Sequence, residues 1–130
     1  MERRTARSCY GRQMSLFAPL TVPVEVRTEA RGSGRRVFRL SASVGESGVV
    51  LQRPAPFDVG QPITANFMLP DAEAATPLSL RARITLRDED GEGAAGGSHL
   101  AFIDPPREAR QTIVRYVARR LGLPSAMSLG

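Results

Sequence analysis

The side chains best able to bind an anion are arginines, and they crowd the start of the chain. All 18 basic residues are arginine, and the formal net charge is +5. Residues 1–40 hold nine arginines and three acidic residues, whereas residues 41–130 hold nine arginines and ten acidic residues. A planar guanidinium donates paired hydrogen bonds to a phosphate, which an ammonium group does not. An arginine-only composition is also typical of GC-rich coding. The candidate ligand-binding residues at this end are Arg3, Arg4, Arg7 and Arg12.

The residue types that catalysis needs are few and scattered. His99 is the only histidine and follows a glycine-rich loop, where a packing or surface role is the commoner one. Cys9 is the only cysteine, so it forms no internal disulfide, and no histidine is near it in sequence. The acidic run at residues 88–92 lacks metal-ligand spacing, and the glycines of residues 91–97 have no lysine to reach a phosphate. We expect no catalytic residue, no metal site and no cofactor, and therefore not an enzyme.

The length and composition are those of one globular domain. The chain has 130 residues, of which 42% are hydrophobic and 24% charged. Its apolar runs are too short to span a membrane, and no apolar segment follows the first arginines as in a secretory signal. We expect a cytoplasmic protein with a basic arm at residues 1–18, a folded domain at residues 19–122 and a flexible tail at residues 123–130.

Alternating apolar and polar residues predict six short strands, with regular structure beginning near Leu20. We expect these strands near residues 22–27, 38–44, 49–51, 63–69, 78–86 and 98–103. In the second, one face would carry Phe38, Leu40, Ala42 and Val44. In the fifth, the core face would carry Leu78, Leu80, Ala82, Ile84 and Leu86, opposite Arg81, Arg83 and Arg87.

The last segment changes from strand to helix periodicity. Asp104 is a candidate N-cap and Pro105 suits the first helical position. Gly122 and Pro124 then end the helix. Its apolar stripe would consist of Ala109, Ile113, Val117 and Leu121. Together the elements predict an all-β fold, a six-stranded antiparallel β-barrel with a C-terminal α-helix packed on it.

The order of these segments resembles that of a PilZ domain, the bacterial receptor module for cyclic di-GMP. The resemblance covers about residues 12–121. It rests on residues 18–24, 43–51, 57–63, 80–84 and 99–104 and on the final helix. It implies the same barrel-and-helix fold, a signalling role without catalysis and cyclic di-GMP as a ligand.

The family binds its ligand partly through an arginine motif, R-R-x-x-x-R, before the first strand. In the register of the following proline, the first arginine is Arg12, the second position is Gln13 and the third is Phe17. Arg3 and Arg7, with three residues between them, belong to a second arginine cluster nearer the start. The guanidinium groups of such a motif neutralise phosphates and contact guanine.

The family's second motif, [D/N]-x-S-x-x-G, lies on a strand. In this sequence its three positions are Ser43, Gly45 and Gly48. The polar positions of the motif offer hydrogen-bonding atoms, and its glycine allows close approach of the ligand. The resemblance therefore implies that these three residues contribute to ligand binding.

Three functions remain open from the sequence. The first is a PilZ-like receptor or effector that senses cyclic di-GMP through a degenerate motif. The second is a PilZ-like adaptor that binds an unidentified protein partner and not the nucleotide. The third, and weakest, is a small basic barrel that binds nucleic acid through Arg81, Arg83 and Arg87. Barrels of that kind stack bases on aromatic residues, which do not interleave with these arginines.

Overall fold

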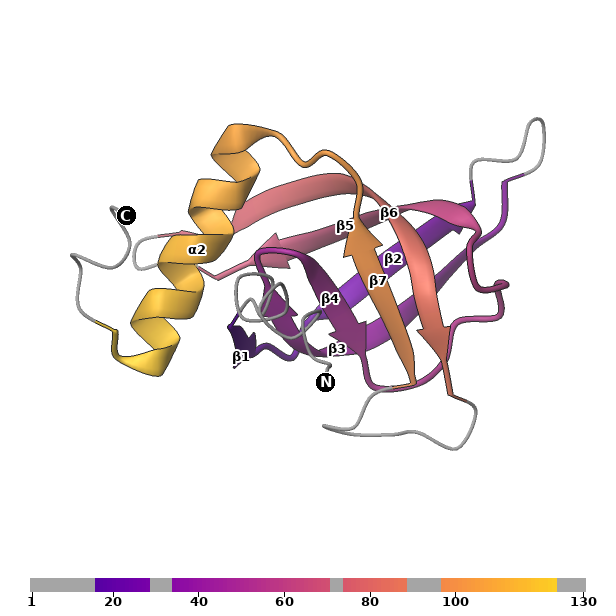
Figure 1. Cartoon of the computed structure of the whole chain (residues 1–130), viewed down its shortest axis with the longest axis horizontal. Helices are drawn as coiled ribbons and strands as arrows, with labels where there is room; N and C mark the ends of the chain where they lie inside the picture. Colours follow the sequence, from indigo (N-terminus) through magenta and orange to yellow (C-terminus); the bar gives the residue numbers. More distant parts are fainter. Residues whose placement is uncertain (1–15, 29–33, 71–73, 89–96, 124–130) are drawn as a thin grey trace, which may run out of the picture.

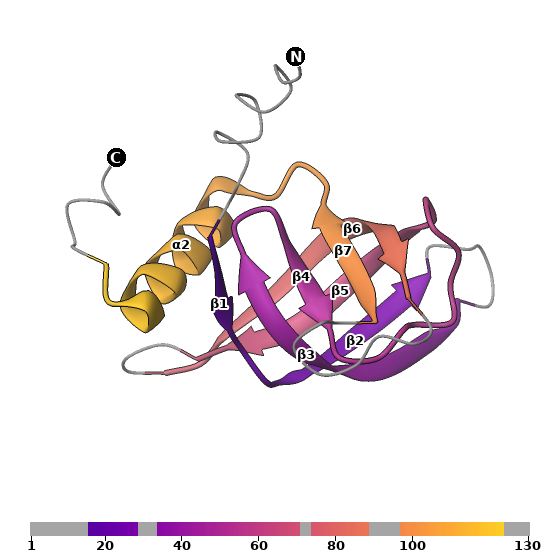
Figure 2. The ribbon, with the colours of Figure 1, turned by 60° about the horizontal axis from the view of Figure 1, so that its bottom comes forward.

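The chain consists mainly of β-strands, and six of them form a closed barrel. The computed structural model describes residues 16–28, 34–70, 74–88 and 97–123. These residues form β1 (Phe17–Pro19), β2 (Pro23–Thr28), β3 (Arg36–Gly45), β4 (Gly48–Leu51), β5 (Pro62–Leu69), β6 (Thr76–Arg87), β7 (Ser98–Phe102) and α2 (Arg107–Leu121). The barrel order is β3, β2, β5, β6, β7 and β4, and β4 pairs back with β3 (Figures 1 and 2). The predicted six-stranded antiparallel β-barrel with a C-terminal helix is confirmed.

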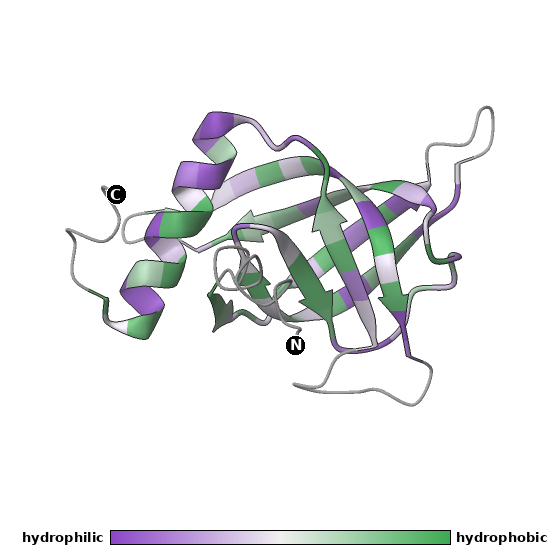
Figure 3. Cartoon of the chain, viewed as in Figure 1, coloured by the Kyte–Doolittle hydropathy of each residue, from purple (hydrophilic) through white to green (hydrophobic). Residues whose placement is uncertain are grey.

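The barrel interior is filled by one face of each strand, as the alternation predicts. In β6 the apolar side chains from Leu78 to Ile84 are buried, and the arginines Arg81 and Arg83 are exposed. The alternation of hydrophobic and hydrophilic residues along the strands is visible in Figure 3. Leu86 does not continue this pattern, because the β6–β7 register shifts between Ile84 and Leu86. Its side chain is 44% exposed, so its predicted place on the core face is wrong.

A second register shift changes the face of β3. It lies between Ser41 and Ser43 in the pairing with β4, and a bulge of this kind rotates the side chains that precede it. Val44 is buried as expected. Phe38 and Leu40 lie outside the barrel, 58% and 47% exposed. The prediction that these apolar residues share one face is therefore wrong.

One short strand precedes the predicted ones. Phe17, Ala18 and Pro19 form β1 and pair with Gly45, Val44 and Ser43 of β3. Ala18 is completely buried in the core. Regular structure thus begins before Leu20, inside the stretch expected to be an irregular arm. Residues 1–15 of that arm and residues 124–130 of the expected tail lie outside the described residues.

The helix begins later than its sequence signals indicate. Pro106 is the N-cap and makes no side-chain capping bond, so the prediction of Asp104 as cap and Pro105 as first helical residue is wrong. Asp104 instead has a left-handed backbone with φ of 44°. It follows Ile103, whose N–H donates to the carbonyl of Arg81. The chain turns here before it can enter the helix.

Helix α2 lies across one end of the barrel beside β1 (Figure 2). Its end at Gly122 is confirmed, with a left-handed φ of 69° and a backbone bond to Arg119. Its buried face includes Ala109, Ile113, Tyr116, Val117 and Ala118, whereas Leu121 of the predicted stripe is 39% exposed. The Tyr116 hydroxyl donates to the carbonyl of Pro19 at 2.7 Å, which joins α2 to β1.

Candidate functional site

The motif positions that the structure describes gather at the corner where β1, β3 and β4 meet. Phe17 of β1 lies opposite Gly45 of β3, and Gly45 in turn lies opposite Gly48 of β4. Ser43 lies opposite Pro19 on one side and Val50 on the other. We call this cluster of Phe17, Ser43, Gly45 and Gly48 the motif corner. Two sequence segments that are 26 residues apart at their nearest motif positions, 17 and 43, are thus neighbours in space.

At the motif corner an aromatic ring occupies the space over a glycine. A Cβ atom added to Gly45 would lie 2.8 Å from Cδ1 and 2.9 Å from Cε1 of Phe17. It would also lie 2.7 Å from the carbonyl oxygen of Leu16. The third arginine position and the serine position of the family motifs are therefore filled by two residues that fit each other.

Gly48, the one strand-motif position that matches the family pattern, is needed by the barrel itself. A Cβ atom there would lie 2.1 Å from the carbonyl oxygen of Leu100, on the neighbouring strand β7. A backbone oxygen cannot move aside as a side-chain tip can. Strand closure therefore explains this glycine without any ligand.

A nearby serine outside the motif has a structural role that sequence analysis missed. Ser41 is completely buried, and its hydroxyl accepts a bond from the N–H of Val22 at 3.0 Å. The same hydroxyl donates to the carbonyl of Leu20. It thereby satisfies two backbone groups of the connection between β1 and β2. Ser43, the motif residue two positions on, is only half-buried.

The hollow beside the motif corner is small. It has a volume of about 190 Å³ and is lined by residues that include Phe17, Gly48, Val50 and His99. Pockets for ligands of nucleotide size usually hold at least about 300 Å³. His99 is half-buried there, and its Nε2 has no hydrogen-bond partner within the described residues. Within the described residues the hollow is shallow, and its lining includes the polar residues Ser47 and Thr85 beside His99.

The remaining candidates fall outside this geometry. Arg3, Arg4, Arg7 and Arg12 lie outside the described residues, as do Gln13, Cys9 and residues 89–92. At the β3–β4 turn, Glu46 forms an exposed ion pair of 3.9 Å with Arg110 of α2.

The described residues contain no group of three or more His, Cys, Asp or Glu side chains that could hold a metal ion. None of the described helices is long and apolar enough to cross a membrane.

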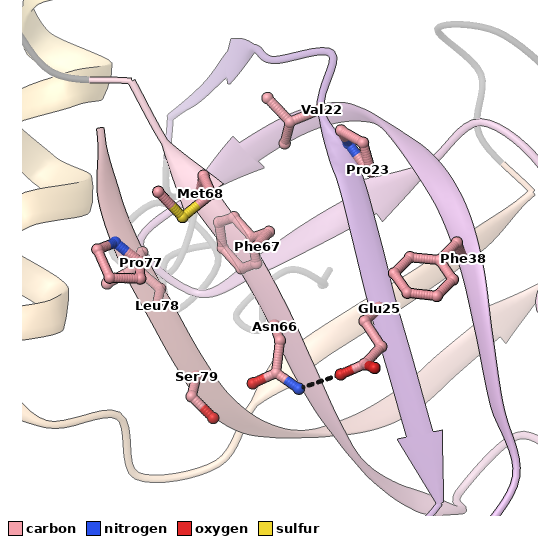
Figure 4. Close-up of a pocket in the computed structure, with 10 residues that line it drawn as sticks. All are labelled: Val22, Pro23, Glu25, Phe38, Asn66, Phe67, Met68, Pro77, Leu78 and Ser79. Carbon is pink, nitrogen blue, oxygen red and sulfur yellow. Dashed lines mark hydrogen bonds between the residues drawn. The ribbon is translucent and has the colours of Figure 1, made fainter. Parts of the chain in front are cut away.

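A second surface, on the outer face of the barrel, was not identified from the sequence. We call it the outer groove. Its volume is about 520 Å³, and the residues that line it include Val22, Phe38, Met68 and Pro77, together with Phe67 and Leu78, whose side chains belong to the core (Figure 4). Glu25 and Asn66 lie among them, joined by a hydrogen bond of 2.7 Å. The alternation in the sequence places Phe38 on the same face as Val44, because it does not reveal the bulge in β3 that directs the Phe38 side chain outward.

The chain folds as a small antiparallel barrel that is extended by β1 and covered at one end by a helix. The family model described as "PilZ domain" matches residues 2–119. The chain therefore belongs to the PilZ domain family, whose members are modules of cyclic di-GMP signalling. None of the curated proteins compared with the chain matches its sequence.

Two solved structures resemble the fold. The Bacillus subtilis inhibitor of motility, MotI/DgrA, has a TM-score of 0.65 and 18% identity. The match covers 93% of this chain but 52% of MotI/DgrA, so this chain spans about half the length of that protein. The PilZ domain of CeSA from a cellulose-synthesizing bacterium has a TM-score of 0.54 and 26% identity. That match covers 79% of this chain and 95% of the other.

Proposed function

We propose that this PilZ domain is a non-enzymatic adaptor that binds a protein partner and does not take cyclic di-GMP in the family's usual site. The observation that carries the proposal is the contact of the Phe17 ring with Gly45. An arginine at position 17 would point a guanidinium at the ligand, and a serine at position 45 would add a hydroxyl. In this chain the Phe17 ring fills that space and packs against the backbone of Gly45.

The expected loss of affinity is large. Gln13 and Phe17 replace two arginines of the family motif. Each charge-assisted hydrogen bond contributes about 1.5–3 kcal/mol in a desolvated site. Losing two therefore weakens binding by about 100-fold to 10,000-fold. Ser43 and Gly45, in place of Asp/Asn and Ser, remove further polar contacts.

Calorimetric titration with cyclic di-GMP tests the proposal. We expect no heat of binding at ligand concentrations up to about 100 μM, roughly the weakest affinity useful for signalling. A variant with Gln13→Arg, Phe17→Arg, Ser43→Asp and Gly45→Ser restores the motif letters. We expect it to bind at least about 100-fold more tightly than the wild type. Tight binding by the wild type would overturn the adaptor proposal.

A receptor that uses the N-terminal arginines is the second candidate. It is favoured by the family match, which begins at residue 2 and includes Arg3, Arg4, Arg7 and Arg12. If the wild type binds cyclic di-GMP, Arg12→Ala and a deletion of residues 2–8 assign the arginines that serve the ligand. A loss of heat only on deletion would indicate the first cluster, and a loss only with Arg12→Ala would indicate the usual register.

A further inference from the structure

The outer face of β3, β2, β5 and β6 is divided into three rows across the strands. The first row is apolar and runs through Leu40, Pro23, Met68 and Pro77. The second contains Phe38, Glu25, Asn66 and Ser79. The third contains Arg36, Arg27, Thr64 and Arg81. An apolar edge and a basic edge thus flank a row in which Phe38 extends the apolar surface and Glu25, Asn66 and Ser79 are polar.

The apolar part is concave and accessible. The side chains of Phe38 and Met68, from the strands on either side of β2, are 58% and 47% exposed. They belong to the wall of the outer groove, with Phe67 between the ribbons in Figure 4. Exposed apolar side chains gathered around a groove are typical of a binding surface.

The basic row has an excess of positive charge. Arg27 and Arg36 lie directly opposite each other on β2 and β3, and like charges in this position destabilise a sheet. Glu25 compensates only in part, through an ion pair of 3.3 Å with Arg36. A negatively charged group bound along this row would relieve the repulsion.

We propose that the outer groove binds an acidic, amphipathic segment of a partner protein. Its apolar side chain would enter the groove beside Met68, and its carboxylate would approach Arg27. Pro23 and Arg27 are four residues apart on β2, or about 13 Å along the strand. An extended segment therefore needs an apolar residue and an acidic residue about four positions apart. This inference rests on the proposed adaptor role.

Two other occupants fit less well. A second copy of this chain would bring its own arginine row, so equal charges would face each other. An anionic membrane presents a broad charged surface, which would lie over the whole groove and over Glu25, whose side chain is 16% exposed. An extended peptide is narrower, and its acidic side chain would lie at Arg27, two residues beyond Glu25 on β2.

Selection from a displayed library of random 12-residue peptides, panned on the full chain, tests the proposal. We expect enriched peptides to be acidic and to repeat the apolar–acidic spacing. Their affinity should fall about tenfold or more for Phe38→Thr/Met68→Thr. It should fall severalfold for Arg27→Gln, with a weaker dependence on salt. The matched controls are Val59→Thr, 59% exposed outside the groove, and Arg107→Gln, exposed on α2. Both should bind within about twofold of the wild type.

The opposing outcomes are separable. The adaptor role is tested separately by the cyclic di-GMP titration. Three outcomes would overturn the groove proposal: equal binding of the peptides to Phe38→Thr/Met68→Thr, enrichment of basic or uncharged peptides, or no enrichment. The same holds if Phe38→Thr/Met68→Thr abolishes co-sedimentation of the protein with phosphatidylglycerol vesicles, or converts a dimer into a monomer in sedimentation velocity. Unchanged circular dichroism and melting temperature of the variant confirm that it is folded.

Discussion

The motif corner and the outer groove differ in how their surfaces are used. At the corner, the positions that the sequence resemblance assigns to the family's binding motifs are closely packed. Gly48 lies against the carbonyl of Leu100, and Phe17 covers Gly45. On the outer groove, Phe38 and Met68 are apolar, and their exposed surface has no partner within the described residues. Gly48 therefore has a structural role in closing the barrel, and the exposed apolar side chains lie on a different face of it.

This contrast has an energetic form. Substitutions of Gly45 and Gly48 at the corner, and of Ser41 beside it, should destabilise the fold, because they collide with neighbouring atoms or leave buried polar groups unpaired. Substitutions in the outer groove should leave stability unchanged and alter only binding.

The largest effect is expected for Gly48→Ala. The added methyl group would overlap the Leu100 carbonyl, which belongs to the β4–β7 pairing that closes the barrel. We expect a loss of at least about 3 kcal/mol in the free energy of unfolding, measured by urea denaturation. Ser47→Ala, in the exposed turn next to it, should change stability by less than about 0.5 kcal/mol. Similar stability of both variants would contradict the structural role of Gly48.

Gly45→Ser should cost about 1–3 kcal/mol, because its side chain collides with Phe17 and with the Leu16 carbonyl. Phe17→Ala in the same chain should recover part of this loss, since it removes the ring. A double-mutant cycle in denaturant then measures a coupling of about 0.5–2 kcal/mol. Additive effects of the two substitutions would show that the ring and the glycine are independent.

Ser41→Ala should cost about 1–2 kcal/mol in unfolding free energy. It leaves the N–H of Val22 and the carbonyl of Leu20 without their buried partner. Ser43→Ala is the matched control, because this half-buried serine has no such pair of bonds to lose. We expect the control to remain within about 0.5 kcal/mol of the wild type. A larger loss of unfolding free energy for Ser43→Ala than for Ser41→Ala would mean that Ser43 is the serine that stabilises the fold.

The sequence was sufficient for the barrel because its alternation is long and regular in the strands that dominate the core. β6 carries four successive core residues, from Leu78 to Ile84, with exposed residues between them. The errors occur where one extra residue interrupts the alternation. The bulge after Ser41 reverses the side chains of Phe38 and Leu40, and the shift after Ile84 exposes Leu86. A local pattern does not contain the partner strand that creates a bulge.

The candidate site was predictable only in part for a similar reason. The resemblance named Ser43, Gly45 and Gly48 as candidate ligand-binding residues and put Phe17 at an arginine position of the other motif; strand pairing makes Phe17 a neighbour of Gly45, while their role in binding stays a prediction. The ring of Phe17 over Gly45 is a contact across strands, which neither segment reveals alone. The outer groove depends on four strands at once, so no single stretch of sequence indicated it.

The smallest effect on stability, and the clearest contrast with the corner, is expected for Phe38→Thr/Met68→Thr. Both side chains are about half exposed, and threonine suits a strand, so little buried surface or β-propensity is lost. We expect the unfolding free energy to stay within about 0.5 kcal/mol of the wild type in urea. A loss of 2 kcal/mol or more, on the scale of a core truncation, would mean that the groove is part of the core. Unchanged stability would instead show that these two apolar residues do not contribute to folding. That result is expected if their exposed surface serves binding.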